Sequence, residues 1–374
     1  MIKPYGNILI NQTISNFDNL IINKKNSIDL DSNEFINLNN IALGYYSPLN
    51  RFCNFKDYKN IVHLNKINNY TKWTIPILLV LKKRKSLYKK NKFYYLEYKK
   101  KIVGAIQAES FFKINKKENN LKIFNTNSKL HPGVKGVNKL KNSFIGGKVY
   151  LLNSCSIKDK YFFSPIYFRK KIFSSNFTAF STRNICHLGH ECIHKKIFSN
   201  DKKLLVSVIV SEKNKYDSKH IINTYNILKK EKLYKNLKLI KIFMPRLFAG
   251  PKEAYLQAII FQNLGIKQFV IGRDHAGVKD FYAKYASQKF FSKKNYLKID
   301  ILKTKEHIFC IHCNKFGFEK GVFCKNDKKK CKYVSIDGNF VKRQILLKNF
   351  EILKKYLNIN ILNYVKKNVI SGKI

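Results

Sequence analysis

One stretch near the middle of the chain combines residue types that bind phosphate or a metal. It reads STRNICHLGHE over residues 181–191. Its two histidines, His187 and His190, are three residues apart, so on a helix they share a face. A helix that starts here presents free N–H groups and its positive dipole end, which suit phosphate. A metal needs a third ligand, and Glu191 points elsewhere on a helix. We therefore predict phosphate binding in preference to a metal site or a purely structural histidine pair.

A second polar motif, GRDHAG, begins at Gly272. Glycine lets the backbone approach a ligand closely, and the guanidinium of Arg273 can bind an anion through two donors. The hexapeptide alone is weak evidence, because loops of this composition are common. No GxxxxGK[ST] motif occurs in the sequence, which excludes a P-loop kinase domain.

The elements around these motifs predict a parallel α/β sheet. Four apolar runs are expected to be strands, and they cover Phe177–Phe180, Leu204–Val210, Leu237–Met244 and Ile266–Gly272. Helical patterns lie between them, at residues 217–233 and from Pro251, near the first helical position, to Gly265 as a stop. Both polar motifs fall at the carboxyl ends of predicted strands, where parallel sheets bind ligands. This coincidence indicates a single site.

The two ends of the chain have other patterns. Up to about residue 155 the sequence is strand-like and rich in turns, with alternating polar and apolar residues over Lys92–Ile114. HPGVKGV at residues 131–137 is expected to be a turn, and IGGKVYLL at residues 145–152 a strand. The last part contains cysteines, then many lysines, and then a helical pattern over Lys342–Tyr356.

The composition is strongly basic. Among 374 residues, Lys and Arg number 73 against 23 Asp and Glu, which gives a formal net charge of +50. The lysines are spread along the chain and accompany many residues of AT-rich codons, so we attribute the charge to codon drift and expect only non-specific, salt-sensitive binding of nucleic acid. The apolar run Ile75–Leu81 is far too short to span a bilayer. We expect no secretory signal, no membrane partner and a cytoplasmic location.

The eight cysteines divide into two sets. Cys53, Cys155, Cys186 and Cys192 are scattered and are expected to pack as small apolar residues. Cys310, Cys313, Cys324 and Cys331 form a CxxC pair followed by two more cysteines, which is typical of a structural zinc site. His312 is a second candidate for the fourth ligand, and four unliganded thiols are the alternative.

Several motifs together resemble one family. STRNICHLGHE matches the pattern QTRNPxHxxHE, AGPKEA at residues 249–254 matches AGPREA, and GRDHAG is intact. GYYSPLNRF at residues 44–52, HPGVKGV and IGGKV are similar to N-terminal landmarks of the same family. Over nearly its full length the chain resembles ATP sulfurylase (sulfate adenylyltransferase), in the bacterial-type single-function form that carries a C-terminal cysteine cluster.

The resemblance implies a fold and a reaction. The fold is α/β: a PUA-like β domain at residues 1–158, a Rossmann-like nucleotidyltransferase domain with a parallel sheet at 159–304, and a small zinc-containing domain at 305–374. The reaction converts ATP and sulfate to adenosine 5′-phosphosulfate and pyrophosphate with Mg²⁺. Members usually form homo-oligomers, and we expect a dimer.

The resemblance also assigns roles to residues. Arg183 orients sulfate with Ser181 and the backbone of Ala276 beside it, and His187 and His190 stabilise the phosphate chain. Thr182 and Asn184 help place the reacting groups. The expected ATP contacts are Ser181, Thr182, Arg183, Asn184, Gly272, Arg273, Asp274 and His275.

Three departures from the family pattern stand out. Ser181 replaces a glutamine, and a lost hydrogen bond to a charged group costs about 1.5–3 kcal/mol, or roughly ten- to a hundredfold in sulfate binding. Ile185 replaces a proline, and only IDGNFVKR at residues 336–343 remains of a C-terminal motif. Transfer to another small anion is therefore one alternative. A non-catalytic basic zinc protein that binds nucleic acid is another, but it has no use for the intact motifs.

Overall fold

The computed structural model describes residues 1–67, 71–172, 176–198, 202–212, 216–291, 296–318, 331–335 and 338–369. The chain forms two compact units. Unit 1 comprises Met1–Ser175, Phe243–Phe269 and Asp274–Ile301, and unit 2 comprises Asn176–Ile242, Val270–Arg273 and Leu302–Ile374. The division into three domains at residues 158 and 304 stays a prediction.

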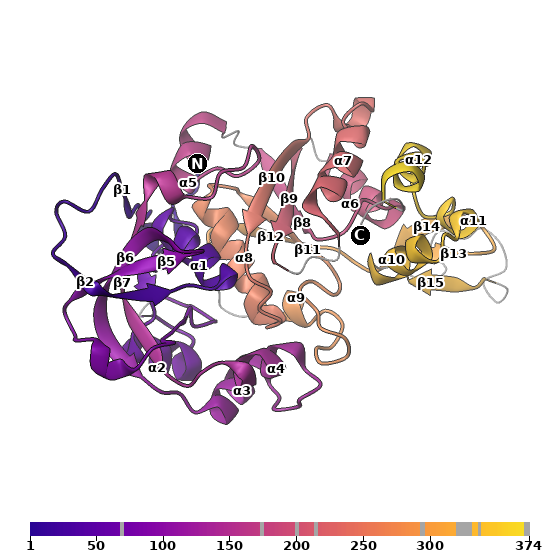
Figure 1. Cartoon of the computed structure of the whole chain (residues 1–374). Coiled ribbons are helices and arrows are strands. Elements are labelled where there is room, and N and C mark those ends of the chain that lie inside the picture. Colours follow the sequence, from indigo (N-terminus) through magenta and orange to yellow (C-terminus); the bar gives the residue numbers. More distant parts are fainter. Residues whose placement is uncertain are drawn as a thin grey trace. The chain divides into compact units, whose positions relative to one another are not determined.

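Unit 1 contains a seven-stranded sheet with the order β1-β7-β6-β5-β2, and β3 and β4 also pair with β7 (Figure 1). The strands are β1 (Thr13–Ile14), β2 (Ile22–Asp29), β3 (Arg51–Phe52), β4 (Leu79–Val80), β5 (Phe93–Tyr98), β6 (Lys101–Phe112) and β7 (Phe144–Leu152). The predicted strands within residues 92–114 are the antiparallel pair β5 and β6. Lys99 and Lys100 form the turn between them, both with positive φ (50° and 63°), as a tight hairpin requires.

Helices cover a larger part of unit 1 than the sequence patterns indicate. They are α1 (Ser32–Ala42), α2 (Phe55–Leu64), α3 (Lys116–Phe124), α4 (Pro132–Lys139), α5 (Pro165–Tyr167), α8 (Pro251–Asn263) and α9 (Ala286–Phe290), with shorter turns η1 (Tyr5–Asn7), η2 (Lys85–Leu87), η3 (Asn153–Cys155) and η4 (Phe168–Ile172). The prediction of a turn at HPGVKGV is wrong, because this segment is α4. Nδ1 of His131 accepts hydrogen bonds from the N–H groups of Gly133 (3.2 Å) and Val134 (3.3 Å), so an imidazole caps the helix where Ser or Asp usually does.

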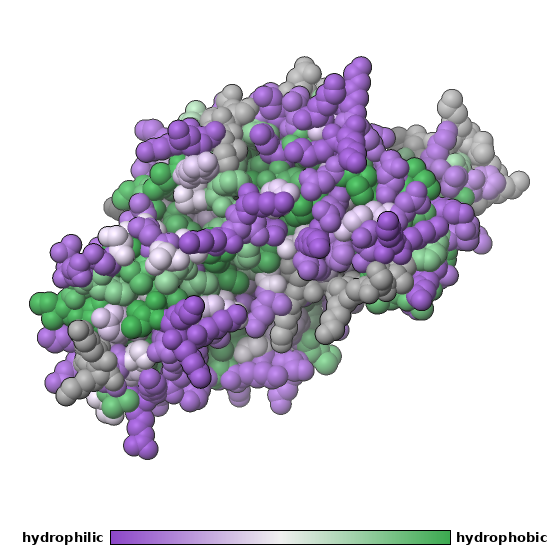
Figure 2. Space-filling model, turned by 45° about the horizontal axis from the view of Figure 1, so that its top comes forward, coloured by the Kyte–Doolittle hydropathy of each residue, from purple (hydrophilic) through white to green (hydrophobic). Residues whose placement is uncertain are grey.

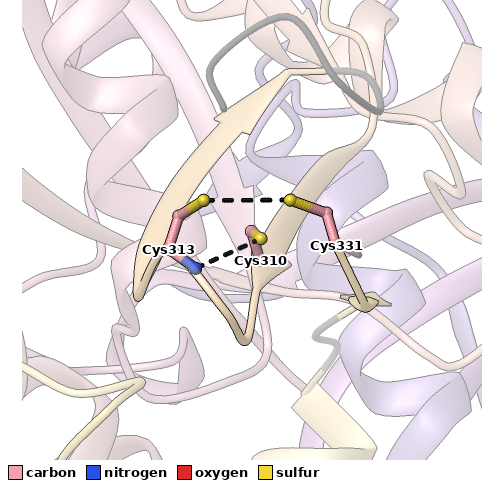
Figure 3. A group of neighbouring side chains, drawn as sticks. All are labelled: Cys310, Cys313 and Cys331. Atoms are coloured by element: carbon pink, nitrogen blue, oxygen red, sulfur yellow. Dashed lines mark hydrogen bonds between the residues drawn. The ribbon is translucent and has the colours of Figure 1, made fainter. Parts of the chain in front are cut away.

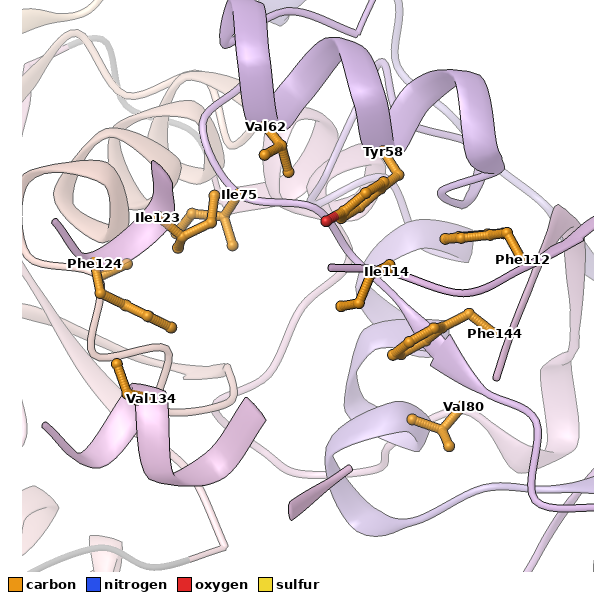
Figure 4. Packing of buried hydrophobic residues seen from close by; sticks show 11 residues of the cluster. Tyr58, Val62, Ile75, Val80, Phe112, Ile114, Ile123, Phe124, Val134 and Phe144 are labelled. Atoms are coloured by element: carbon orange, nitrogen blue, oxygen red, sulfur yellow. The ribbon is translucent and has the colours of Figure 1, made fainter. Parts of the chain in front are cut away.

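Part of the core of unit 1 joins these helices to the sheet. The cluster in Figure 4 takes apolar side chains from α2, α3, α4, β6 and β7. It comprises Tyr58, Val62, Ile75, Val80, Phe112, Ile114, Ile123, Phe124, Val134, Phe144 and Ala249. Fully burying a large apolar side chain contributes about 1.5–3 kcal/mol, so this cluster fixes the helices on the sheet.

A five-stranded sheet has the order β10-β9-β8-β11-β12. Its strands are β8 (Phe177–Thr182), β9 (Lys203–Val210), β10 (Lys238–Phe243), β11 (Gln268–Ile271) and β12 (Asp300–Lys303). The predicted parallel α/β sheet is confirmed: β8 and β9 are parallel, with Phe177 opposite Lys203 and Thr182 opposite Val208. β8 is longer than the predicted strand, so Ser181 and Thr182 are its last two residues. The predicted helix from Pro251 is α8, and Gly265 follows it with φ of +88°.

Two helices of unit 2 follow β8 and β9 in the chain, α6 (Leu188–Phe198) and α7 (Ser218–Leu228), and η5 (Lys232–Tyr234) comes next. In the C-terminal part, β13 (His307–Cys310), β14 (Lys315–Phe318) and β15 (Tyr333–Ser335) form an antiparallel sheet. It is followed by α10 (Gly338–Leu346), α11 (Phe350–Leu353) and α12 (Ile359–Asn368). The single helical pattern over residues 342–356 is wrong in extent, because Lys348 has a positive φ of 53° and separates α10 from α11.

Hydrophilic residues make up much of one face of the surface (Figure 2). On the face in Figure 2, hydrophilic side chains are spread over the molecule and alternate with smaller apolar areas. Among the described residues, no helix combines the length and the apolar character needed to cross a membrane.

Candidate active site

The loop after β8 is fixed by one hydroxyl group. Oγ1 of Thr182 accepts the N–H of Asn184 (3.0 Å) and donates to the carbonyl oxygen of the same residue (3.2 Å). This local turn places Arg183 at its tip, between the end of the strand and the start of α6. Thr182 itself is buried, so the turn is anchored in the sheet.

His187 and His190 form a stacked pair where α6 begins. The carbonyl oxygen of His187 accepts the N–H groups of His190 (2.8 Å) and Glu191 (3.1 Å), so His187 is the residue that precedes the helix. The two ring centroids are 3.8 Å apart with an interplanar angle of 29°. The N–H of Leu188 already donates to the carbonyl oxygen of Tyr356 (2.9 Å), so the start of α6 offers a ligand fewer N–H groups than an exposed helix end.

α7 holds this loop through two consecutive residues. Oγ1 of Thr224 accepts the N–H of Cys186 (3.2 Å) while it donates to the carbonyl oxygen of Ile221 (2.8 Å). The hydroxyl of Tyr225 lies 3.4 Å from Nδ1 of His190. The loop therefore has one backbone anchor and one side-chain anchor on the same helix.

The histidines around this pair are held in their neutral form. Burial, and then the nearby His187, His194 and His307, lower the pKa of His190 well below its usual value. Burial, with a smaller effect of His187, lowers the pKa of His194 to about 3, and burial with Lys196 lowers the pKa of His307 to about 4. These imidazoles are uncharged near pH 7, so each offers one N–H donor rather than a full positive charge.

Sequence analysis missed His194 and His307. His194 follows His190 by one helical turn, and its ring packs edge-on against Phe180 at a centroid distance of 4.8 Å. That spacing could have indicated a third histidine on the same helix face. It was not used, because a histidine on the buried face of a helix is often only a core residue. His307 comes from β13 and gives no local signal.

Two predicted site residues carry buried oxygen atoms without hydrogen-bond partners in the described part of the chain, Oγ of Ser181 and Oδ1 of Asn184. Oγ of Ser207, which is opposite Ser181 on β9, is in the same state among the described residues. Gly338 packs against the amide of Asn184 so closely that a Cβ atom at this position would overlap its Cγ, Nδ2 and Oδ1. Buried polar atoms in this state are typical of sites that bind a ligand or ordered water.

Gly272 and Arg273, the first two residues of GRDHAG, belong to unit 2 and follow β11, the neighbour of β8 in the sheet. Nη1 of Arg273 forms an ion pair with Oε1 of Glu306 at 2.9 Å. This pair restricts the guanidinium and leaves it further donors for a phosphate.

The last four residues of GRDHAG, from Asp274 to Gly277, belong to unit 1. Nε2 of His275 lies 2.9 Å from Oε1 of Gln257, and the carbonyl oxygen of His275 accepts a hydrogen bond from Oγ of Ser287 (2.7 Å). Ala276 has a positive φ of 58°, and Asp274 leaves no room for a Cβ atom at Gly277. The turn is therefore fixed by local contacts, and a larger residue at Gly277 would have to displace the carboxylate of Asp274.

Three of the four predicted cysteine ligands lie together (Figure 3). The ligand atoms of Cys310, Cys313 and Cys331 all lie within 4.8 Å of one another, and Sγ of Cys313 and Sγ of Cys331 are 3.9 Å apart. The N–H of Cys313 donates to Sγ of Cys310 (3.4 Å), which stabilises a thiolate. A tetrahedron with Zn–S bonds of about 2.3 Å has S···S edges of about 3.8 Å, so the group fits zinc. Cys324 lies outside the described residues, and His312 is exposed and not part of the group.

Comparison with known proteins places the chain in a family. The model of the ATP-sulfurylase family matches residues 159–364, and that of a PUA-like domain matches residues 2–154. A protein named sulfate adenylyltransferase from Pyrococcus abyssi is 31% identical over 327 residues, which cover 85% of this chain and 84% of the relative. Another of that name, from Thermococcus onnurineus, is 29% identical over 355 residues and covers 92% of both chains.

A solved structure described as a hexameric APS kinase from Thiobacillus denitrificans shares the fold, with a TM-score of 0.72 and 14% identity, over 99% of this chain and 69% of that chain. The matched family model covers more than half of the chain and includes the loop after β8, the stacked histidines and the cysteine group. This chain belongs to the ATP-sulfurylase family.

Proposed function

We propose that this chain is a sulfate adenylyltransferase, which converts ATP and sulfate to adenosine 5′-phosphosulfate and pyrophosphate. The observation that carries the proposal is the stacked pair of His187 and His190 directly after the turn that presents Arg183, with His190 held neutral by burial. The names of the curated relatives support the same activity.

The chemistry suits a site that positions and neutralises charge. An oxygen of sulfate attacks the α-phosphorus of ATP, a new O–P bond forms, and the bond to the β-phosphate oxygen breaks as pyrophosphate leaves with the electron pair. Sulfate is already a dianion at pH 7, so no general base is needed. The main obstacle is the approach of one anion to another, which oriented donors overcome.

Each predicted residue has a role in this scheme. Arg183 binds sulfate, with Ser181 and the backbone of Ala276 as further contacts. Thr182 shapes the turn, and Asn184 places the reacting groups. The remaining contacts to ATP come from the N–H donors of His187 and His190 and from Gly272, Arg273, Asp274 and His275.

We assign the metals different roles. Mg²⁺ enters as part of the substrate MgATP, because the side chains of the loop after β8 are nitrogen and hydroxyl donors that suit phosphate oxygens better than a hard cation. Zinc would be structural, held by Cys310, Cys313, Cys331 and, as we propose, Cys324. Four protein ligands would leave no open position for catalysis.

A second candidate function is adenylyl transfer to another small anion. The buried hydroxyl of Ser181, which has no hydrogen-bond partner among the described residues, favours it, because a ligand of different size can supply that partner. We further propose a cytoplasmic homodimer, which size-exclusion chromatography with light scattering tests directly, and only non-specific binding of nucleic acid.

Pyrophosphate release from MgATP, with and without sulfate, tests the proposal. Wild type is expected to release pyrophosphate only with sulfate, and Arg183→Ala is expected to lose this activity. Arg84→Ala is the matched control, because it removes the same group from an exposed position in unit 1.

Activity of Ser181→Gln that exceeds wild type with sulfate would favour another natural acceptor, and a screen of small oxyanions then identifies it. If folded, zinc-loaded wild type releases no pyrophosphate with any oxyanion, nucleotide transfer is refuted as the function.

A further inference from the structure

The scheme above gives no role to Tyr225, a buried side chain beside the histidine pair. Tyr225 of α7 is fully buried, and its hydroxyl lies 3.4 Å from Nδ1 of His190. The preceding residue, Thr224, fixes the backbone of the same loop at Cys186. The phenol therefore approaches His190 from a firmly held element.

The chemistry of the neighbours sets the direction of this hydrogen bond. The phenol has one proton, and among the described residues its hydrogen-bond contacts are with Nδ1 of His190 and the thiol of Cys186, while Tyr234 and Glu191 act on it electrostatically. Sulfur is a weak acceptor and an imidazole nitrogen is a good one, so the phenol donates to Nδ1. Burial raises the pKa of Tyr225 well above its usual value, which keeps the phenol protonated at neutral pH.

The ring of His190 is held in one orientation by its other neighbours. His187 stacks on it, and the ring of Phe180 meets it edge-on at a centroid distance of 5.0 Å. The ring of His194 lies further away, at a centroid distance of 6.4 Å, and His194 and His307 both help to lower the pKa of His190. With Nδ1 turned to the phenol, Nε2 is the nitrogen left for a ligand.

A neutral imidazole has one N–H group and one lone pair. If the proton is on Nδ1, Nε2 presents its lone pair to a phosphate oxygen, and the two repel each other. If the proton is on Nε2, the same nitrogen donates a hydrogen bond. We propose that Tyr225 is a positioning residue that fixes the tautomer of His190 with the proton on Nε2, so that His190 donates to the phosphate chain of the nucleotide. The nucleotide part of this inference rests on the proposed function.

Nitrogen-15 NMR of the histidine side chains in the nucleotide-free wild type tests the first step without any variant. We expect the shifts of His190 to show a protonated Nε2 and an unprotonated Nδ1 at pH 7. A protonated Nδ1 would overturn the proposal. This measurement does not use activity, so its failure is distinct from a failure of the proposed function.

Tyr225→Phe tests the second step because it removes only the hydroxyl. We expect a mixture of both tautomers at His190 and a roughly tenfold fall in kcat/KM for ATP, the effect of one hydrogen bond. Tyr234→Phe is the matched control: Tyr234 is equally buried, and its hydroxyl contacts Nδ1 of His194 at 3.3 Å instead. We expect the control to keep kcat/KM near that of wild type.

A double-mutant cycle separates positioning from packing. In a His190→Ala background, Tyr225→Phe is expected to change kcat/KM no further, because the tautomer it controls is gone. If Tyr225→Phe lowers kcat/KM equally in both backgrounds, or if Tyr234→Phe lowers it as much, the hydroxyl contributes to core packing and not to the tautomer of His190. Either result would overturn the proposal.

Discussion

Gly338→Ala tests whether the position of the Asn184 side chain matters for catalysis. Gly338 is the first residue of α10, and a methyl group there would overlap three atoms of the Asn184 amide. The amide is at the far end of a short side chain, so it can move without displacing the backbone. To restore van der Waals contact it must retreat by about 1 Å.

The size of the effect follows from this displacement. A misplacement of about 1 Å in a group that orients the reactants costs up to about a hundredfold in rate, so we expect kcat to fall ten- to a hundredfold. The free energy of unfolding should change little, because the amide can move without displacing the backbone. Sulfate-dependent pyrophosphate release measures the first quantity, and urea unfolding the second.

Gly136→Ala is the control for this experiment. Gly136 lies in α4 of unit 1, and a Cβ atom there meets no atom within 4 Å. The control should match wild type in activity and be equally or slightly more stable. Wild-type activity in a folded Gly338→Ala would refute the role assigned to Asn184. Loss of both activity and stability would show that the backbone moved instead, which also contradicts the reasoning.

Three further predictions concern metal content and pH. Cys313→Ser should lower the zinc content and the melting temperature together, and a variant that keeps both values would exclude the metal site. Burial and then Glu231 raise the pKa of Glu191 from 4.5 to about 7, so the folded state holds a proton that the unfolded state releases, and stability falls as pH rises between these values. Urea unfolding should show Glu191→Gln gaining on wild type from pH 5.5 to pH 8 by about 2 kcal/mol, and a constant difference would contradict this pKa. Burial lowers the pKa of His194 to about 3, so wild type should lose stability as pH falls below about 6.5. Melting curves at pH 7 and pH 5 should show a smaller loss of stability in His194→Phe than in wild type. An equal loss in both proteins would refute this role of His194.

The parts of the fold that local sequence determines could be predicted. β9 is buried along nearly its whole length, so it appears in the sequence as one apolar run. α8 begins at Pro251 and is followed by Gly265, both of which are local signals. The cysteine group could also be predicted, because the CxxC spacing places two ligands in one turn between β13 and β14.

The features that depend on distant residues could not be predicted. Gly338 packs against Asn184, and Tyr225 contacts His190. Neither the glycine nor the tyrosine lies in a sequence motif that indicates such a contact. The helix at HPGVKGV was missed for a different reason. Its cap is the imidazole of His131, a residue type that sequence rules for helix starts do not include.

The overall charge and the local charge of the site act in different ways. A net charge of +50 attracts any anion, so it brings nucleotides, sulfate and nucleic acid to the surface without distinguishing them. In α6 the imidazoles of His190 and His194 are neutral, because burial, and then the histidines near them, lower their pKa values. Neutral donors bind only a ligand that meets them in the right geometry, whereas a cluster of cations would hold the substrate and the product pyrophosphate alike. We infer that selectivity at the proposed site depends on which nitrogen of His190 carries its proton, and on the buried hydroxyl group of Tyr225 that decides it.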